Sequence, residues 1–320
     1  MHSAILLLAY NRWDLVEKRL VELAKSNVKP TDVVLSVDGS PDPNLNQERE
    51  VHINRLKKLD LPFEFEVILR PINLGCSSHI ITAVTETLNQ YESVIVIEDD
   101  VSVSPFFLES MNEAFDLIAL HDDVGTIGGF STFHKRSHFP LFFKANYWRK
   151  SRYFSAWGWG TTKEFWRSFV RVSEVKNLDE YLSQSSVWNN FTRRKKNIWL
   201  RRFNRGVWDF NVQLALFKND KFNLLPALRL IDNEGFSDER STHTKHRRPR
   251  NLFGEGKSNM IPKKIEEFRF SPLKKFFWGF VDSNLWAADG LFNARGREAG
   301  VRTIIRKIFD YSKINFLKYF

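Results

Sequence analysis

Three consecutive acids, Glu98, Asp99 and Asp100, directly follow the β-branched run Val94–Ile97. Such a run is typical of a strand that is buried on both faces at the centre of a parallel sheet. Carboxylates at the end of a buried strand repel one another unless a cation neutralises them. Their hard oxygen ligands suit Mn²⁺ or Mg²⁺, and these ions in turn bind phosphates. The alternative is a strand that ends in a solvated acidic turn, and the triplet alone does not separate the two.

The surrounding sequence predicts the elements that would position this triplet. The expected strands are Ser3–Ala9, Asp32–Val37, Glu64–Leu69, Val94–Ile97 and Val124–Gly128. The expected helices between them are Trp13–Ser26, Glu48–Leu59, Ser77–Asn89 and Pro105–Leu120. This alternation predicts an α/β fold with a mainly parallel sheet, flanked by helices and joined by right-handed crossovers. Ligands of such sheets bind beyond the carboxyl ends of the strands, which is where the polar candidates fall.

Four motifs at strand ends carry a resemblance to a known family. They are Ala9-Tyr10-Asn11-Arg12, Val37-Asp38-Gly39-Ser40, Arg70-Pro71-Ile72-Asn73-Leu74-Gly75 and Glu98-Asp99-Asp100. In this order, over roughly residues 3–130, the chain resembles the GT-A glycosyltransferases, in particular the N-acetylglucosaminyltransferase I type and bacterial family-2-like enzymes. No GxGxxG follows the first strand and no GxxxxGK[ST] occurs, which disfavours a Rossmann dinucleotide site and a P-loop.

The resemblance implies a GT-A (Rossmann-like) fold and a nucleotide-sugar donor, most simply a UDP-sugar. It implies that Asp38 contacts the uracil or ribose, that Asp99 contacts the ribose or donor sugar, and that Asp100 coordinates a divalent metal. The remaining nucleotide-sugar contacts would come from Ala9, Asn11, Arg12, Arg70, Asn73 and Gly75. The metal, Mn²⁺ or Mg²⁺, would neutralise charge on the departing nucleoside diphosphate. For Asp38, a purely structural turn before Gly39 stays open.

The aromatic stretch Phe154–Phe165 contains Trp157, Gly158 and Trp159. Glycine allows close backbone approach, and an indole face can form the flat apolar wall of a sugar site. The resemblance implies that this stretch lines the donor-sugar and acceptor sites. A buried aromatic turn is the alternative interpretation.

Asp209 is the candidate catalytic base. It stands in Val207–Asn211, which begins an expected helix, and the resemblance places the base in an acidic W-D-D-W-like element here. The chain has a single acid in this element, with Phe210 where a second acid might stand, so the register is open by one residue. An inverting transfer needs one carboxylate to take the proton of the acceptor hydroxyl. An N-cap or helix-dipole role is the alternative.

His243 is a second candidate ligand for the metal, in a Thr-His pair that follows a glycine turn. The resemblance implies that it contacts the metal or the diphosphate, and a neutral imidazole is a competent ligand. A solvated loop histidine is the alternative.

The composition places the chain among soluble globular proteins, with 42% hydrophobic and 27% charged residues. The single cysteine, Cys76, excludes an internal disulfide framework and fits a reducing compartment. No apolar run approaches the about 18 residues of a membrane span, and no signal peptide is apparent. We therefore expect a cytoplasmic, bacterial protein. The amphipathic basic tail, Val301–Phe320, predicts either packing on the domain or peripheral contact with the inner face of the membrane.

Three regions are expected along the chain. Residues 1–130 form a nucleotide-sugar-binding α/β half, residues 131–260 a loop-rich, aromatic and basic acceptor-binding and catalytic half of the same GT-A domain, and residues 261–320 a basic, partly amphipathic helical extension. The net charge of +10 comes from the part beyond Lys135. Such charge attracts polyanions.

The leading hypothesis is a metal-dependent, inverting glycosyltransferase that moves a sugar from a UDP donor to a hydroxyl of a glycan or lipid-linked acceptor. A basic nucleic-acid- or membrane-surface-binding protein without catalysis is the main alternative. It does not explain acids at strand ends, which repel phosphates unless a metal is present, so we expect no nucleic-acid partner. A sugar-1-phosphate nucleotidyltransferase would need a glycine-rich loop after the first strand, and Tyr10–Trp13 lacks glycine. The sugar, the acceptor and the oligomeric state stay open.

Overall fold

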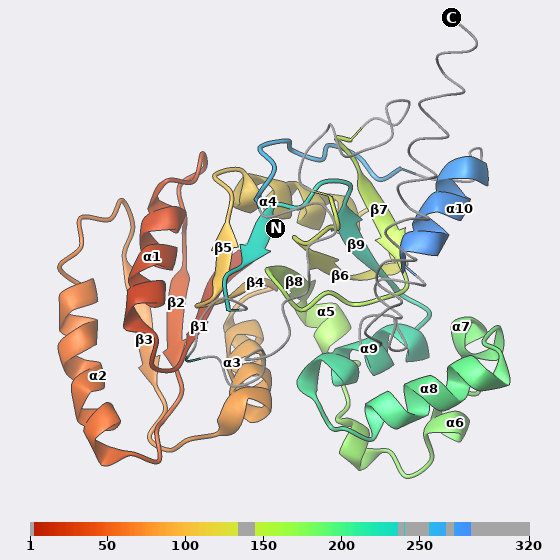
Figure 1. The fold of residues 1–320 in the computed structure, drawn as a ribbon, viewed down its shortest axis with the longest axis horizontal. Coiled ribbons are helices and arrows are strands. Elements are labelled where there is room, and N and C mark those ends of the chain that lie inside the picture. Colours follow the sequence, from red (N-terminus) through yellow and green to blue (C-terminus); the bar gives the residue numbers. More distant parts are fainter. Residues whose placement is uncertain (1–2, 134–144, 236–239, 241–255, 267–271, 283–320) are drawn as a thin grey trace, which may run out of the picture.

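The computed structural model describes residues 3–133, 145–235, 240, 256–266 and 272–282 (Figure 1). Within these residues the centre is an eight-stranded mixed sheet with the order β3-β2-β1-β4-β8-β6-β9-β7. The strands are β1 (Ser3–Ala9), β2 (Val33–Val37), β3 (Phe65–Leu69), β4 (Ser93–Glu98), β6 (Val124–Gly128), β7 (Trp148–Ser151), β8 (Trp159–Thr162) and β9 (Phe222–Pro226). β1 to β4 pair in parallel, whereas β8 runs antiparallel to both β4 and β6. The predicted α/β fold with a mainly parallel sheet is therefore confirmed.

Helices cover both faces of the sheet. They are α1 (Trp13–Ala24), α2 (Pro43–Leu56), α3 (Gly75–Gln90), α4 (Phe107–Ile118), α5 (Lys163–Trp166), α6 (Leu178–Tyr181), α7 (Ser186–Asn189), α8 (Arg193–Phe203), α9 (Trp208–Lys218) and α10 (Pro272–Val281). On β1, Leu7 packs in one core cluster with α1, α2 and α4, and Leu8 packs in another with α3, α5 and α9. Because successive side chains of a strand point to opposite faces, an uninterrupted apolar run marks a strand buried on both sides.

The predicted elements of the first half are confirmed, with one boundary corrected. The helix expected at Glu48–Leu59 begins at Pro43. Asp42 caps it, because its side-chain Oδ1 accepts the backbone N–H of Asn44 at 2.9 Å. Proline is well suited to the first helical turn, where its missing N–H leaves no bond unmade. The Pro-Asn-Leu-Asn stretch at residues 43–46 is thus helical.

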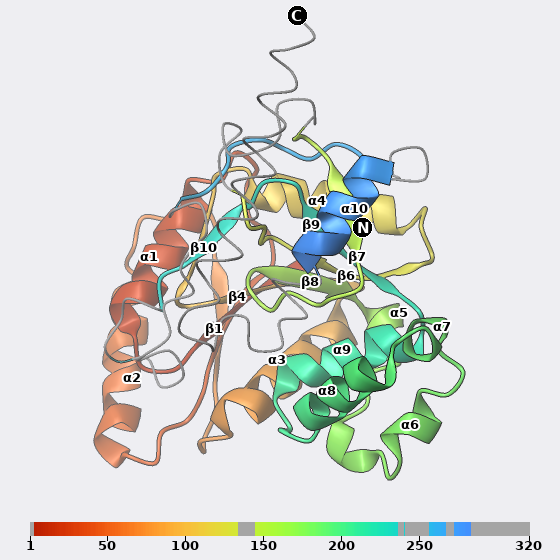
Figure 2. The same ribbon diagram turned by 45° about the vertical axis from the view of Figure 1, so that its right-hand side comes forward.

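Two short helices, α6 and α7, form a helical layer with α8 beside α9. Their core is aromatic, with Tyr153 stacked on Trp199 at 5.9 Å between ring centroids and Phe217 edge-on to Trp199 at 5.0 Å. Figures 1 and 2 show α6, α7 and α8 together next to α9, on the side of the sheet that also carries α3. Helix α9 also contacts α3, which joins this layer to the face of the sheet that α3 covers.

The last described helix, α10, is tied to the sheet through a buried ion pair. Arg149 of β7 donates through Nη1 to Asp282, at 2.8 and 3.0 Å, and its guanidinium lies over the Trp278 ring at 4.0 Å. Trp278 in turn donates to the Tyr147 hydroxyl at 3.0 Å. In the part of the chain that is described, no helix is long and apolar enough to cross a bilayer. The basic tail Val301–Phe320 lies outside the described residues.

Candidate active site

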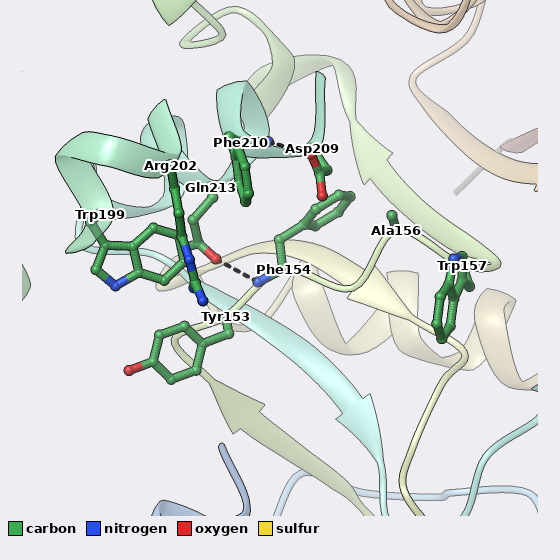
Figure 3. Close-up of a pocket in the computed structure, with 9 residues that line it drawn as sticks. All are labelled: Tyr153, Phe154, Ala156, Trp157, Trp199, Arg202, Asp209, Phe210 and Gln213. Atoms are coloured by element: carbon green, nitrogen blue, oxygen red, sulfur yellow. Dashed lines mark hydrogen bonds between the residues drawn. The ribbon is translucent and has the colours of Figure 1, made fainter. Parts of the chain in front are cut away.

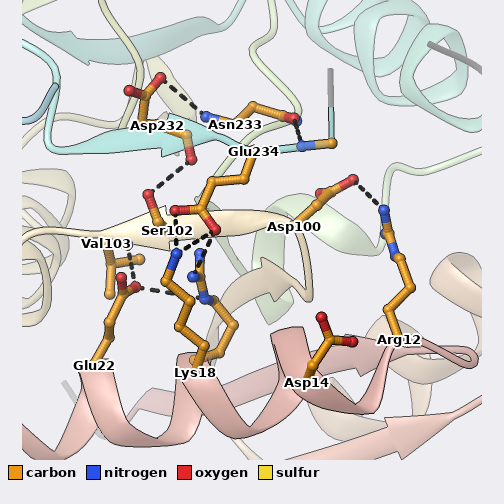
Figure 4. Close-up of polar contacts among 12 residues, drawn as sticks. Arg12, Asp14, Lys18, Glu22, Asp100, Ser102, Val103, Asp232, Asn233 and Glu234 are labelled. Atoms are coloured by element: carbon orange, nitrogen blue, oxygen red, sulfur yellow. Dashed lines mark hydrogen bonds and ion pairs between the residues drawn. The ribbon is translucent and has the colours of Figure 1, made fainter. Parts of the chain in front are cut away.

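The acidic triplet stands at the carboxyl end of β4, next to the start of α1. Asp99 is 3% exposed and accepts two hydrogen bonds from Arg12, one of them from Nε at 3.1 Å. Arg12 Nη1 also donates to Asp100 Oδ2 at 3.0 Å (Figure 4). Burial raises the pKa of Asp99 to about 7 against the opposing charge of Arg12. For Glu98, burial and the charges of Asp100 and Asp99 raise the pKa well above its usual range.

The second oxygen of Asp100 is the clearest sign of a cation site. Asp100 Oδ1 is buried and has no hydrogen-bond partner among the described residues. A buried carboxylate oxygen without a donor is costly, and a hard cation is a suitable partner for it. Within the described residues no three His, Cys, Asp or Glu side chains form a metal cluster. Mg²⁺-type ions are often held by one or two carboxylates and by substrate phosphates, so Asp100 fits this role. His243 lies outside the described residues.

A short second sheet lies next to Asp100. β10 (Ile231–Asn233) pairs antiparallel with β5 (Val101–Val103), and the N–H of Glu234 donates to the Asp100 carbonyl at 2.7 Å. Lys18 Nζ donates to Glu234 at 2.7 and 2.8 Å, and Arg19 Nη2 donates to it at 3.1 Å (Figure 4). The following Gly235 then lies directly against the Asp100 carboxylate. This turn therefore determines where Asp100 can point.

The loops after β2 and β3 lock together through Asp38. Its Oδ1 accepts the N–H groups of Gly39 and Leu74, each at 2.9 Å, and Asn73 Nδ2 donates to the Gly39 carbonyl at 2.8 Å. Asp38 is 4% exposed. One carboxylate oxygen thus has the structural turn role that the sequence left open. A nucleoside contact by Asp38 or Asn73 stays a prediction.

The other predicted nucleotide-sugar residues line the same strand ends. Arg70 pairs with Glu86 at 3.0 Å through Nη1, and the Ala9 carbonyl accepts the N–H of Asp38 at 3.0 Å. Gly75 begins α3 with φ +75°, a left-handed conformation that favours glycine. Asn11 follows β1 and is exposed. Their contacts to a nucleotide stay predictions.

Asp209 stands in the first turn of α9 and at the edge of a pocket. The N-cap position belongs to Val207, and Asp209 Oδ1 accepts only the adjacent N–H of Phe210, at 2.9 Å. The N-cap part of the alternative is therefore wrong, whereas the helix-dipole part stays open because Asp209 is an acid in the first turn of α9. Burial raises the pKa of Asp209, opposed by its backbone hydrogen bonds and by the charge of Arg202. A carboxylate with a raised pKa is a stronger base than an ordinary aspartate.

The pocket beside Asp209 has a volume of about 190 Å³ and is mainly aromatic (Figure 3). Its lining residues are Tyr153, Phe154, Ala156, Trp157, Trp199, Arg202, Asp209, Phe210 and Gln213. Aromatic walls with a few polar groups are the usual lining of a small-molecule site. Sequence reasoning singled out Trp157 and Asp209 and missed Trp199, Arg202 and Gln213. The one available signal was the basic run around Arg202, which contains no acid.

Of the two predicted sugar-stacking tryptophans, one is in place and one is not. Trp157 is half-buried and lines the pocket, edge-on to Phe130 at 5.0 Å between centroids. Trp159 is fully buried, with Trp208 at 5.5 Å. The prediction that Trp159 offers a face to a sugar is wrong, because β8 inserts between β4 and β6 and carries its side chain into the core. Gly158 between them adopts φ +54°, which explains the glycine.

Cys76, in the first turn of α3, lies within electrostatic range of the triplet and of Asp209. Desolvation raises the pKa of the Cys76 thiol, and the charges of Glu98, Asp100, Asp209 and Asp38 raise it further. These four carboxylates lie on α9 and at the carboxyl ends of β4 and β2, and the charge of each acts on the Cys76 thiol. Asp209 also raises the pKa of Glu98. Asp100 and Asp209 therefore both act electrostatically on the start of α3.

The family model described as Glycosyl transferase family 2 matches residues 4–171, which is more than half of the chain. The chain belongs to glycosyl transferase family 2. In this family-2 glycosyltransferase the matched segment runs from β1, through the acidic triplet, to the loop after α5. The predicted GT-A, family-2-like resemblance is confirmed, and the two alternatives, a non-catalytic binding protein and a nucleotidyltransferase, lose their support.

The chain is also similar, at low sequence identity, to several solved structures. The chain is similar to mannosyltransferase PcManGT from Pyrobaculum calidifontis in complex with GDP-Man and Mn²⁺ (15% identity over 52% of this chain and 45% of that chain, TM-score 0.35). It is also similar to S. aureus TarS 1-349 (15% identity over 72% and 59%, TM-score 0.39). A third is glucosyl-3-phosphoglycerate synthase from Mycobacterium tuberculosis with Mn²⁺, UDP-Glc and phosphoglyceric acid (9% identity over 72% and 71%, TM-score 0.40). The first two matches span about half of those solved chains. None of the curated proteins matches the chain.

Proposed function

We propose that this family-2 glycosyltransferase is metal-dependent and inverting, and that it moves a sugar from a UDP donor to a hydroxyl of a glycan or lipid-linked acceptor. The observation that carries the proposal is the buried, unpartnered Oδ1 of Asp100. The buried carboxylate of Asp209 supports it, because the charges of Asp100 and Asp209 both raise the pKa of the Cys76 thiol. A lone acidic strand end would explain neither the open oxygen nor the second carboxylate.

Each charged residue has a separate task in this proposal. Asp209 accepts the proton of the acceptor hydroxyl while that oxygen attacks the anomeric carbon. Arg12 holds Asp99 and one oxygen of Asp100, which leaves Asp100 Oδ1 for the cation. Mn²⁺ or Mg²⁺, when bound by Asp100, neutralises charge on the leaving nucleoside diphosphate. Asp38 supports the loop against which the nucleoside lies.

An inverting transfer assigns separate tasks to Asp209 and Asp100 in this proposal. Asp209 enters from α9 and Asp100 from the end of β4, on two elements that approach the cleft separately. In an inverting transfer the acceptor oxygen and the leaving group occupy opposite sides of the anomeric carbon. In this proposal Asp209 serves the acceptor and Asp100 serves the leaving group.

A thermal-shift panel of nucleotide sugars with and without Mn²⁺ tests the proposal, because a ligand that binds only the folded state raises the melting temperature. We expect a UDP-sugar to stabilise the wild type in Mn²⁺. Asp100→Asn should lose this stabilisation, whereas Asp209→Asn should keep it and lose transfer. Asp60→Asn, at an exposed acid outside the site, is the matched control. If no nucleotide sugar stabilises the protein, or if Asp100→Asn still responds to Mn²⁺ and donor, the proposal is wrong.

A further inference from the structure

Helix α8 and the residues after it carry an unusual excess of positive charge. The cations are Arg193, Arg194, Lys195, Lys196, Arg201, Arg202 and Arg205, and residues 193–205 contain no acid. Arg193 and Arg194 are exposed in the first turn of α8, where the helix dipole already contributes positive charge. Lys196 lies 3.8 Å from Asp179, and the remaining excess of positive charge attracts anions to this surface.

One of these cations, Arg202, reaches the pocket of the proposed base. It stands in the last turn of α8, its guanidinium lies over the Trp199 ring at 4.8 Å, and it lines the same pocket as Asp209. Figure 3 shows the Arg202 side chain running down beside Trp199 into that pocket. The charge of Arg202 also acts on the pKa of Asp209, which places the two groups in electrostatic range.

The pocket is lined by one neutral amide and by two charged groups. Gln213 is committed to the backbone, since its Oε1 accepts the N–H of Phe154 at 2.8 Å and its Nε2 donates to the Arg152 carbonyl at 2.9 Å. Among the lining residues, Arg202 and Asp209 are the two that carry charge. A neutral sugar needs the base for its hydroxyl and aromatic walls for its ring. It has no need of a guanidinium in the same pocket.

We propose that the acceptor of this enzyme is an anionic glycan, whose phosphate or carboxylate group binds Arg202 while a hydroxyl of the same or the adjacent sugar lies at Asp209. A guanidinium binds phosphate and carboxylate through two parallel hydrogen bonds, which fixes the orientation of the group as well as its position. Trp157 and Trp199 supply the walls between which the sugar ring lies. The inference rests on the proposed function, because it takes Asp209 as the base.

Calorimetric titration with glucose 6-phosphate and with glucose tests this inference on the full chain. EDTA is present so that the donor-metal site contributes nothing. We expect the wild type to bind the phosphorylated sugar at least about tenfold more tightly, since charge-assisted hydrogen bonds are the strong ones. Arg202→Gln should lose that preference, and Arg202→Lys should retain part of it. Arg201→Gln removes the same charge from the exposed side of the helix and should retain all of it.

Two results would overturn the inference. The first is equal binding of both sugars by the wild type. The second is an equal loss of the preference for glucose 6-phosphate in Arg202→Gln and Arg201→Gln. That result would mean that the preference comes from the total charge of the helix and not from Arg202. Phosphatidylglycerol vesicles form a further arm, and binding to vesicles without any response to glucose 6-phosphate would assign the cations to a membrane surface instead. Donor stabilisation in Mn²⁺ is measured on the same variants. If the donor still stabilises Arg202→Gln in Mn²⁺, the absence of a preference for glucose 6-phosphate rejects this inference and leaves the proposed function standing.

Discussion

Replacement of Gly235 by alanine is expected to disable the enzyme while leaving it folded. A Cβ at this position would overlap Asp100 Oδ2, and it would lie 2.9 Å from Asp100 Cγ and 3.1 Å from Asn233 Oδ1. Ordinary contacts of a Cβ begin at 3.4 Å. The Asp100 carboxylate therefore has to move by about half an ångström at Cγ and by more at Oδ2, and it can do so only by turning away from its position in the cleft.

The backbone cannot relieve this clash, because β10 is paired with β5 and the N–H of Glu234 donates to the Asp100 carbonyl at 2.7 Å. The side chain of Asp100 gives way instead. An off-rotamer side chain costs about 0.5–1.5 kcal/mol, which a folded domain tolerates. A misplacement of about 1 Å in a catalytic group costs about 100-fold in rate. We therefore expect kcat to fall about 100-fold in Gly235→Ala, and the Mn²⁺ concentration for half-activation to rise.

The assay is sugar transfer at saturating donor over a Mn²⁺ titration, together with a melting temperature for each variant. Gly206→Ala is the matched control, because Gly206 has φ +65° and an added Cβ there meets no atom within 4 Å. That variant strains the backbone by about 1 kcal/mol and leaves Asp100 untouched, so it should lower the melting temperature and keep kcat. Unchanged kcat and Mn²⁺ dependence in a folded Gly235→Ala protein would refute the reasoning, and so would an equal loss of activity in the control.

Three further predictions concern the base and the core. Asp209→Asn should lose about 10²–10⁴-fold in kcat. In the wild type, only the carboxylate form of Asp209 accepts a proton, so kcat should fall as the pH drops through the pKa of Asp209. Because burial raises this pKa, the fall in kcat should lie above pH 3.8. Trp159→Ala should destabilise the fold by about 3–5 kcal/mol in urea titration, with acceptor KM unchanged because the side chain is buried. Asp282→Ala leaves Arg149 buried without its partner, and chemical denaturation should show a loss of about 3–5 kcal/mol.

The pattern of apolar residues was sufficient to predict the strands that are buried on both faces. The apolar runs that become β1 and β4 are uninterrupted and end at polar motifs, so both their type and their ends follow from local physics. Strand order is different, because it depends on pairing between distant segments. Nothing local says that Trp159–Thr162 inserts antiparallel between β4 and β6, and this insertion is what buries Trp159. Trp157 stands in the same aromatic stretch of the sequence, yet its side chain is only half-buried and lines the pocket.

The acceptor pocket illustrates the same limit at a functional site. Tyr153, Trp199 and Arg202 come from a loop and from α8, and they meet Asp209 only when α8 packs on α9. Asp209 was predictable because an acid in an expected first helical turn is a local feature. Arg202 was not, because its charge is one of several in a basic run and only the packing shows which cation faces the base.

The two carboxylates at the centre of the proposal differ in how the fold constrains them. Asp100 has three neighbours that restrict it: Arg12 donates to one oxygen, the N–H of Glu234 holds its carbonyl, and Gly235 closes the space beside it. Asp209 has one local hydrogen bond and is set mainly by burial. A metal ligand needs a fixed position, whereas a base needs a raised pKa and access to the acceptor. The rigid strand end and the pocket edge meet these two requirements separately, so substitutions around Asp100 should change metal dependence and substitutions around Asp209 should change the pH profile.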